Sequence, residues 1–223
     1  MMVRWGVTPN AISLGSIGFA VVAAAALVGA ATADSVVAAA ALLAVAAAAI
    51  QGRLVCNLID GLVAVEGGRG TPNGELFNDV PDRLADPIIL VAAGFAAAAL
   101  LDWRPPRSDH DPVVCYHTVW YATPSFCRSL GWAAGLASVL TAYVRVLGVS
   151  IGTPADFGGP MAKQHRMAVM TAACVVAAGA VWIDRNWAGG TLYFALGTIC
   201  VGCLLTIALR LRRAHRTLGG GDG

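Results

Sequence analysis

Acidic side chains gather in one short part of a chain that is otherwise rich in alanine, valine and leucine. Six of the 13 acidic residues fall between positions 57 and 86. On a helix, residues three or four apart share a face, so Asn57 and Asp60 would point the same way. The same holds for Asn78, Asp82 and Asp86, which repeat at intervals of four. Oxygen donors on two packed helices suit a hard divalent cation, and Mg²⁺ typically combines few protein carboxylates with phosphate oxygens of its substrate.

Two more acidic residues lie beside this face. Glu75 is one turn before Asn78, so it could reach the same cation and is the preferred substitute for a missing carboxylate. Asp79 and Asp86 are the next candidates. Alternatively, Glu75 and Asp79 only stabilise the positive N-terminal end of the third helix. Pro81 would fall in the first turn of that helix, where a proline costs little.

The elements that carry these residues are long and apolar. Of the 223 residues, 57% are hydrophobic and 13% are charged, and the mean hydropathy is +0.69. This composition excludes an ordinary soluble domain and is typical of a polytopic membrane protein. Residues 1–223 are therefore expected to form a single all-α membrane domain with six transmembrane helices and no nucleic-acid partner. Apolar runs of spanning length cover Ala11–Ala31, Ser35–Cys56, Val80–Leu101, Ser129–Ile151, Met167–Ile183 and Gly189–Leu209.

The basic residues predict an orientation. With a cytoplasmic N-terminus, eleven of the 15 Lys and Arg residues fall on the inner side. Both termini and the acidic cluster would then be cytoplasmic, in a bacterial inner (plasma) membrane. The basic tail, residues 210–223, would act as a stop signal or contact anionic lipid headgroups. Residues 102–128 would form an outer loop, in which Cys115 and Cys127 could form a disulfide.

The order of the polar residues resembles the signature of the CDP-alcohol phosphatidyltransferase family. That signature is D-x-x-D-G-x-x-A-R, a spacer, and G-x-x-x-D-x-x-x-D. The resemblance extends over residues 57–86 and matches six spans with the motif between the second and third. The chain carries, in order, Asn57-x-x-Asp60-Gly61-x-x-Ala64 and Gly74-x-x-x-Asn78-x-x-x-Asp82.

The resemblance implies an integral membrane enzyme of phospholipid biosynthesis. It would transfer a substituted phosphate from a CDP-linked lipid such as CDP-diacylglycerol to an acceptor alcohol, with release of CMP. By position, Asp82 would be the catalytic base of a site that holds two divalent cations, Mg²⁺ or Mn²⁺. A homodimer is a further implication. The metal-site positions would be Asn57, Asp60, Asn78 and Asp82, supplemented by Glu75 or Asp79, and the nucleotide contacts Asp60, Gly61, Ala64 and Gly74.

The chain departs from the signature at three positions. Asn57 and Asn78 replace acids, and Val65 stands where the family has arginine. An asparagine carbonyl can ligate a hard cation, but more weakly than a carboxylate. A catalytically weakened homologue that acts as a membrane scaffold or as a nucleotide- or lipid-binding protein is therefore the alternative function. A transporter is disfavoured because the acids lie at one edge, without a second cluster near the midplane of later spans.

Basic residues at the ends of the fourth and fifth runs could bind a phosphate. Arg145 closes the fourth span, and Lys163 and Arg166 open the fifth. In the family, similar residues bind the phosphate of the acceptor or of the lipid. They could equally follow the positive-inside bias alone. The sequence leaves the acceptor open among glycerol phosphate, inositol phosphate, serine and other alcohols.

Overall fold

The computed structural model describes residues 9–66, 72–101 and 123–219, and these ranges contain six α-helices and no strand. The prediction of an all-α protein is thus confirmed over the described residues. The helices are α1 (Pro9–Thr32), α2 (Val36–Glu66), α3 (Pro72–Leu101), α4 (Pro124–Ser150), α5 (Lys163–Ala180) and α6 (Arg185–Gly219).

Five of these helices are long and apolar enough to cross a membrane, and α5 is the exception among the described residues. It has 18 residues, and Lys163 and Arg166 occupy its first turn. At 1.5 Å per residue, its apolar part from Met167 to Ala180 is about 21 Å long, less than the roughly 30 Å of a bilayer core. The helices fit an integral membrane protein, and the fifth helix starts four residues earlier and ends three residues earlier than the apolar run that the sequence predicted.

Side-chain caps mark the helix starts. Ser35, Thr123 and Asp184 each accept a hydrogen bond from a backbone N–H two or three residues later, at distances of 3.0, 3.3 and 3.0 Å. These bonds satisfy N–H groups that the first turn leaves without a partner. Pro124 follows its cap directly, and α1 begins at Pro9. Proline fits there because the first helical residue needs no donor.

Two helices begin earlier than expected. Helix α3 starts at Pro72, so Pro81 lies inside it together with Pro87. The prediction that Pro81 belongs to the first turn was wrong, and each proline removes one backbone hydrogen bond. Helix α4 starts at Pro124, which shortens the expected outer loop. Cys127 is free and buried in the first turn of α4, and Cys115, the partner considered for a disulfide, lies outside the described residues.

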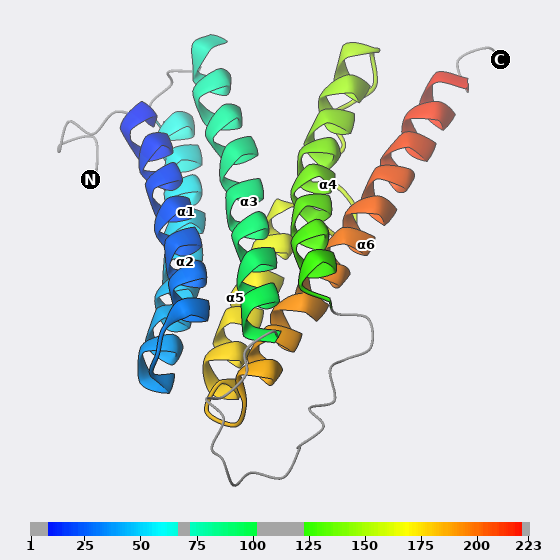
Figure 1. The fold of residues 1–223 in the computed structure, drawn as a ribbon. Helices are drawn as coiled ribbons and strands as arrows, with labels where there is room; N and C mark the ends of the chain where they lie inside the picture. The colour runs from blue at the N-terminus through cyan, green and yellow to red at the C-terminus, as the bar shows by residue number, and fades with distance from the viewer. Residues whose placement is uncertain (1–8, 67–71, 102–122, 220–223) are drawn as a thin grey trace, which may run out of the picture.

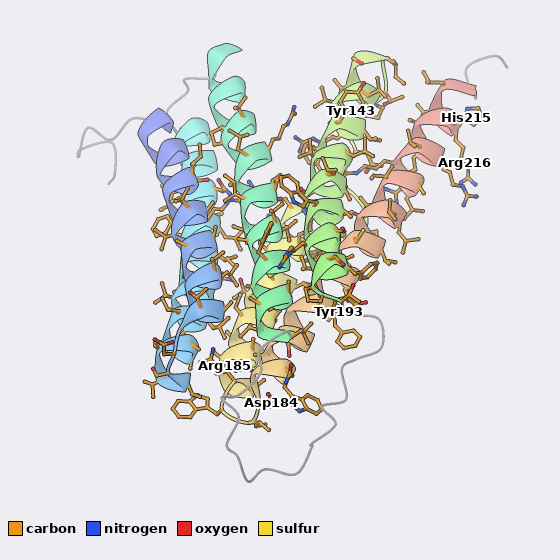
Figure 2. The ribbon with its side chains drawn as sticks, in the orientation of Figure 1. Tyr143, Asp184, Arg185, Tyr193, His215 and Arg216 are labelled. Carbon is orange, nitrogen blue, oxygen red and sulfur yellow. The ribbon has the colours of Figure 1, made fainter. Side chains whose placement is uncertain are left out.

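The helices form a ring. Helix α1 packs on α2 and α3, α3 packs on α4 and α6, and α5 lies between α2 and α6. Figure 1 shows the end of α2, the start of α3 and the end of α6 at one end of the bundle. Figure 2 shows His215 and Arg216 at this end and Asp184 and Arg185 at the opposite one. The acidic stretch and the basic end of α6 therefore share one side, as expected.

The segment between α4 and α5, residues 151–162, turns back into the bundle. Gly159 has a φ of +127° and lies directly against Thr206 of α6. A side chain at this position would be strained and would also collide with Thr206. Met161 N–H then donates to Thr206 Oγ1 at 3.0 Å. Helix α5 consequently begins part-way along the bundle and runs toward the opposite end (Figure 1).

Candidate active site

The relative register of α2 and α3 is set by Arg53. Its side chain has 0% exposure and reaches from α2 to two carboxylates on α3. Nη2 lies 3.3 Å from Asp82 Oδ1 and Nη1 lies 2.7 Å from Asp86 Oδ1. Asn57 lies one turn after Arg53, and Asn78 lies one turn before Asp82. Because the helices run in opposite directions, Asn57 on α2 falls at about the level of Asn78 on α3, one turn beyond the ion pair of Arg53 with Asp82.

Asp82 meets a cation at each of its two oxygens. Arg53 Nη2 donates to Oδ1 at 3.3 Å and also to the backbone carbonyl of Asp82 at 3.4 Å. Lys163 Nζ donates to Oδ2. The carboxylate is 23% exposed and the lysine 29%, whereas the arginine is enclosed. The contact between Arg53 and Asp82 is thus buried inside the helix bundle, whereas the contact between Lys163 and Asp82 is partly exposed to solvent.

Asp86 holds the centre of a buried charge network. Its carboxylate is 4% exposed and lies between two guanidinium groups. Arg166 donates to Oδ2 from Nη2 at 2.7 Å and from Nε at 3.2 Å, so both bonds end on the same carboxylate oxygen. The Arg53 Nη1 atom is close to Oδ1 but is not aligned for a hydrogen bond. Asp86 therefore connects α2, α3 and α5.

The inward course of residues 151–162 places the two basic residues of α5. Arg166 Nη1 donates to the carbonyl of Met161 at 3.1 Å, which ties the first turn of α5 to the segment before it. Arg210 of α6 donates to the carbonyl of Gly158 at 3.1 Å and to that of Thr141 at 2.7 Å. These bonds fix the second half of the segment, directly before Lys163, and tie it to α5 and α6.

A cavity of about 90 Å³ opens beside Asp82 and Asp86. Helices α3, α4, α5 and α6 all contribute to its wall. Its polar and charged lining consists of Asp82, Arg83, Asp86, Ser138, Thr141, Arg145, Lys163, Arg166 and Arg210. Five basic side chains and two carboxylates in so small a space favour an anionic ligand.

A second cavity of about 450 Å³ continues along α4 and α6 from the first. Arg145 and Arg210 line both. In the second cavity Arg213 donates to the two oxygens of Asp156 at 3.2 and 3.0 Å, and the guanidinium of Arg145 lies 5.1 Å from the centre of the Phe157 ring. The two cavities together form a basic path from the end of the bundle toward Asp82.

The structure brings together part of the predicted site. Lys163 contacts Asp82, Arg166 contacts Asp86, and Arg145 lines the same cavity. Asn57 lies on the α2 face that carries Arg53. The remaining predicted residues belong to helices α2 and α3, but their side chains lie outside the described part: Asp60, Gly61, Ala64, Gly74, Glu75, Asn78 and Asp79.

Two residues of the site were missed in the sequence analysis, where both entered only as inner-side charges. Arg53 is a single arginine in an apolar run, four residues before Asn57, and its helical spacing was the available signal. Arg210 belongs to the basic end of α6, where several arginines follow one another. Only the tertiary structure separates this buried one from its exposed neighbours Arg212 and Arg213.

The described residues partly fit a divalent metal ion. Among them, no group of three His, Cys, Asp or Glu side chains is arranged to hold one. However, the buried amide nitrogen of Asn57 has no hydrogen-bond partner. A half-turn of an amide exchanges its nitrogen and oxygen, so this side chain can offer an oxygen donor. Together with Asp82 and the motif positions Asp60 and Asn78, the donor set is oxygen-only and suits Mg²⁺ or Mn²⁺.

No protein-family model and no curated protein sequence matches the chain. Solved structures do match it. The phosphatidylinositol phosphate synthase PgsA1 of Mycobacterium tuberculosis, in complex with manganese and citrate, has a TM-score of 0.66 and 17% sequence identity, over 96% of this chain and 85% of that one. Its form with CDP-DAG bound has a TM-score of 0.65 and 18% identity over 96% and 89%. Its apo form has a TM-score of 0.62 and 16% identity over 95% and 90%. The likeness establishes a shared fold.

Proposed function

We propose that this protein is a CDP-alcohol phosphatidyltransferase, which moves a substituted phosphate from a CDP-linked lipid to an acceptor alcohol and releases CMP. The observation that carries the proposal is the position of Asp82. This residue belongs to α3, the helix that bears the second half of the family motif, and it borders the basic cavity. The fold shared with structures that hold manganese and CDP-DAG supports it.

The α2 and α3 ends would bind the donor. Gly61, Ala64 and Gly74 would let a nucleotide approach the helix backbones closely, because they carry little or no side chain. A bound divalent cation would neutralise negative charge that develops on the departing CMP. Its ligands would be Asn57, Asp60, Asn78 and Asp82, with Glu75 or Asp79 replacing a missing carboxylate.

Asp82 would accept the proton of the acceptor hydroxyl as the new bond to phosphorus forms. The buried Arg53 side chain forms an ion pair with the Oδ1 atom of Asp82. Lys163 is 29% exposed, so rotation of its flexible side chain can release Oδ2 and leave that oxygen to take the proton. The same lysine can then contact a phosphate in the cavity.

The basic cavity would select an acceptor that carries a phosphate. Arg145 and Lys163 border it and can contact that group directly. Arg166 has Nε, Nη1 and Nη2 engaged with Asp86 and Met161, so it would act through its charge and by positioning. Arg166 and Arg210 are buried, and the positive-inside bias alone does not account for buried arginines.

The protein would cross a bacterial inner membrane with all six helices. Its two termini and the active site would face the cytoplasm, where CTP-derived donors and Mg²⁺ are available. Helix α5 would span with help from residues 181–183, which extend it in turns. A homodimer in the membrane is part of the proposal.

CMP release from CDP-diacylglycerol by purified protein tests this function. We expect release to require Mg²⁺ or Mn²⁺ together with an alcohol, and to be fastest with a phosphate-bearing acceptor. Asp82→Asn should lower the rate by about 10²–10⁴-fold because the proton acceptor is lost. Asp34→Asn, in the exposed turn at the opposite end, is the matched control and should retain the parental rate. A full rate in Asp82→Asn would contradict the assignment.

One observation favours the alternative, a weakened homologue that binds nucleotide or lipid without turnover. Both oxygens of Asp82 are already in ion pairs, and two motif acids are asparagines. In that case CDP-diacylglycerol should bind and stabilise the protein thermally while no acceptor yields CMP. CMP formation with any acceptor would exclude this alternative.

A further inference from the structure

The second cavity carries more positive than negative charge, and no step of the proposed reaction uses its outer part. The charged side chains in its lining are Arg145, Arg210, Arg213, Arg216 and Asp156. Arg145 and Arg210 also line the first cavity, whereas Arg213 and Arg216 line only the second. These two lie three residues apart on α6 and share a face. The volume of about 450 Å³ is typical of a ligand site, and the surplus of positive charge favours an anionic ligand.

Asp156 marks the place where an anion can bind. Its Oδ1 atom accepts from the backbone N–H of Gly158 at 2.8 Å, and Arg213 Nη1 donates to Oδ1 and Oδ2 at 3.2 and 3.0 Å. Every hydrogen bond that Arg213 donates to a described side chain comes from Nη1, so Nε and Nη2 remain for a further acceptor. The ion pair is partly exposed, and such pairs contribute little to stability. A phosphate can therefore compete for this guanidinium, whose geometry suits phosphate oxygens.

Arg210 supplies a buried positive charge on the inner wall. Its Nε and Nη1 atoms donate to backbone carbonyls, which are neutral. The one acidic residue in the lining of the second cavity, Asp156, is paired with Arg213. The carboxylates of the first cavity, Asp82 and Asp86, are paired with other basic side chains. A buried charge is costly without an ionic partner, so an anion bound in the second cavity would reduce that cost.

The depth of Arg213 in the membrane indicates the source of the anion. Trp182 and Trp187 are exposed at the opposite end of the bundle, and exposed tryptophans are typical of a membrane–water interface. About 39 Å of α6 separates Trp187 from Arg213, and an average tilt of about 20° reduces this to about 37 Å. A bilayer is about 30 Å thick in its hydrocarbon core and about 40–45 Å with its headgroups. Arg213 thus lies at headgroup level, and Leu205 and Leu209, closer to the membrane centre, are exposed as expected beside acyl chains.

We propose that the second cavity binds the phosphate of an anionic phospholipid of the adjacent leaflet. Arg213 and Arg216 contact the phosphate, Arg145 and Arg210 add positive charge at the inner wall, and Asp156 competes with the phosphate for Arg213. The donor of the proposed reaction would bind at the ends of α2 and α3, so this lipid is a second one and its binding does not depend on turnover. A soluble phosphate shares the same recognition chemistry, but the depth of Arg213 favours the lipid.

Native mass spectrometry of the full-length protein in a non-ionic detergent tests this binding. Phosphatidylglycerol and phosphatidylcholine with identical acyl chains are titrated separately, and inorganic phosphate serves as a competitor. Phosphatidylglycerol should bind at least about tenfold more tightly than phosphatidylcholine, because two arginines contact its uncompensated phosphate. Equal affinities would overturn the proposal. Displacement of phosphatidylglycerol by an equal concentration of inorganic phosphate would assign the cavity to a soluble anion and would also overturn it.

Two neighbouring arginines separate a specific site from general attraction. Arg213→Gln should weaken phosphatidylglycerol binding by about fivefold, because it removes a direct contact with the phosphate. Arg212→Gln is the matched control, since it removes the same charge from an exposed position of α6 that does not line the cavity. It should change the affinity by less than about twofold. Equal weakening in both variants would mean that the basic end of α6 attracts the lipid without this cavity, contrary to the proposal.

Asp156→Asn should change the affinity in the opposite direction. Binding of phosphatidylglycerol should tighten by about fivefold, because the competing negative charge is removed, and the gain should disappear when Arg213→Gln is added. A loss of folding cannot produce tighter binding, so this variant remains informative even if Arg213→Gln is unstable. Unchanged or weaker binding by Asp156→Asn would overturn the proposal. The expected binding without any CMP release would contradict the proposed function only.

Discussion

The two halves of helix α3 are held by different interactions. Its C-terminal half packs closely against α4, and its N-terminal half carries the ion pairs of Asp82 and Asp86. Near the end of α3, Gly94 and Gly131 meet so closely that a Cβ on Gly94 would lie 2.8 Å from the Gly131 Cα. About two turns closer to the start of α3, Pro87 lies against Gly135 of α4. The next residues on that side of α4, Ser138 and Thr141, line the cavity.

The difference shows how one helix can be fixed and still serve a polar site. Small residues let two backbones approach, as is common between membrane helices. This seam gains its stability from close packing and contains no charge. The N-terminal half of α3 cannot pack as closely, because Asp82, Asp86 and the basic side chains paired with them need space and hydrogen-bond partners. Close packing below therefore holds α3 in the position from which Asp86 reaches Arg53 and Arg166.

The largest effect is expected from breaking the charge network on one side only. Asp86→Leu leaves the buried Arg166 without its carboxylate and Arg53 with Asp82 alone, and it should lower the free energy of unfolding by about 3–5 kcal/mol. Denaturation of the purified protein in detergent would measure it. The triple variant Arg53→Met, Asp86→Leu, Arg166→Leu should recover most of this loss, because both guanidinium groups are removed together with Asp86, and Asp82 keeps its ion pair with the partly exposed Lys163. Equal instability of both proteins would show that packing, not charge, decides this region.

A smaller effect is expected at the seam. In Gly131→Ala the new Cβ would lie 2.9 Å from the Gly94 Cα. The helices must separate slightly, which should lower the free energy of unfolding by about 1–3 kcal/mol. Gly197→Ala is the matched control, since no atom lies within 4 Å of a Cβ there, and should show no loss in the same denaturation experiment. Similar losses in both variants would mean that glycine mobility, rather than close contact, matters at the seam.

The smallest effect is expected at Asp156, outside both regions. Burial alone would raise its pKa, but hydrogen bonds from Gly158 and Arg213 and the charge of Arg213 hold the pKa below its ordinary value. The stabilisation is therefore complete above the unfolded-state pKa and is lost as the pH falls through the lower folded-state pKa. Asp156→Asn should cost less than about 1 kcal/mol at pH 7, because the pair is partly exposed.

The pH dependence supplies the check. The difference in unfolding free energy between the parent and Asp156→Asn should disappear when both are measured in strongly acidic buffer. A difference that persists there would assign the effect to the shape of the asparagine and not to ionisation.

The helices were predictable because their signal is local. Apolar runs of spanning length and the four-residue spacing of Asn78, Asp82 and Asp86 are features of the sequence itself. The ends were harder to predict. Proline is favoured in a first turn, so Pro81 suggested a helix start there, but the structure places the start at Pro72 and keeps Pro81 and Pro87 inside the helix.

The partners within the site were less predictable. Asp82 and the basic residues of α5 could be named from the motif and from charge, yet their pairing depends on the inward turn of residues 151–162. Arg53 resembles any inner-side arginine until its neighbours on another helix are known. Contacts between residues 29 or 80 positions apart, such as those of Asp82 with Arg53 and of Asp86 with Arg166, have no trace in local periodicity.

The inward course of residues 151–162 has a consequence for permeability. Because α5 starts part-way along the bundle, a water-soluble acceptor in the proposed reaction would cross only part of the membrane to reach Asp82. Ion leakage would then have to be prevented by the other half of the bundle. There Gly94 and Gly131 bring α3 and α4 into close contact, so this seam would exclude water below the proposed site.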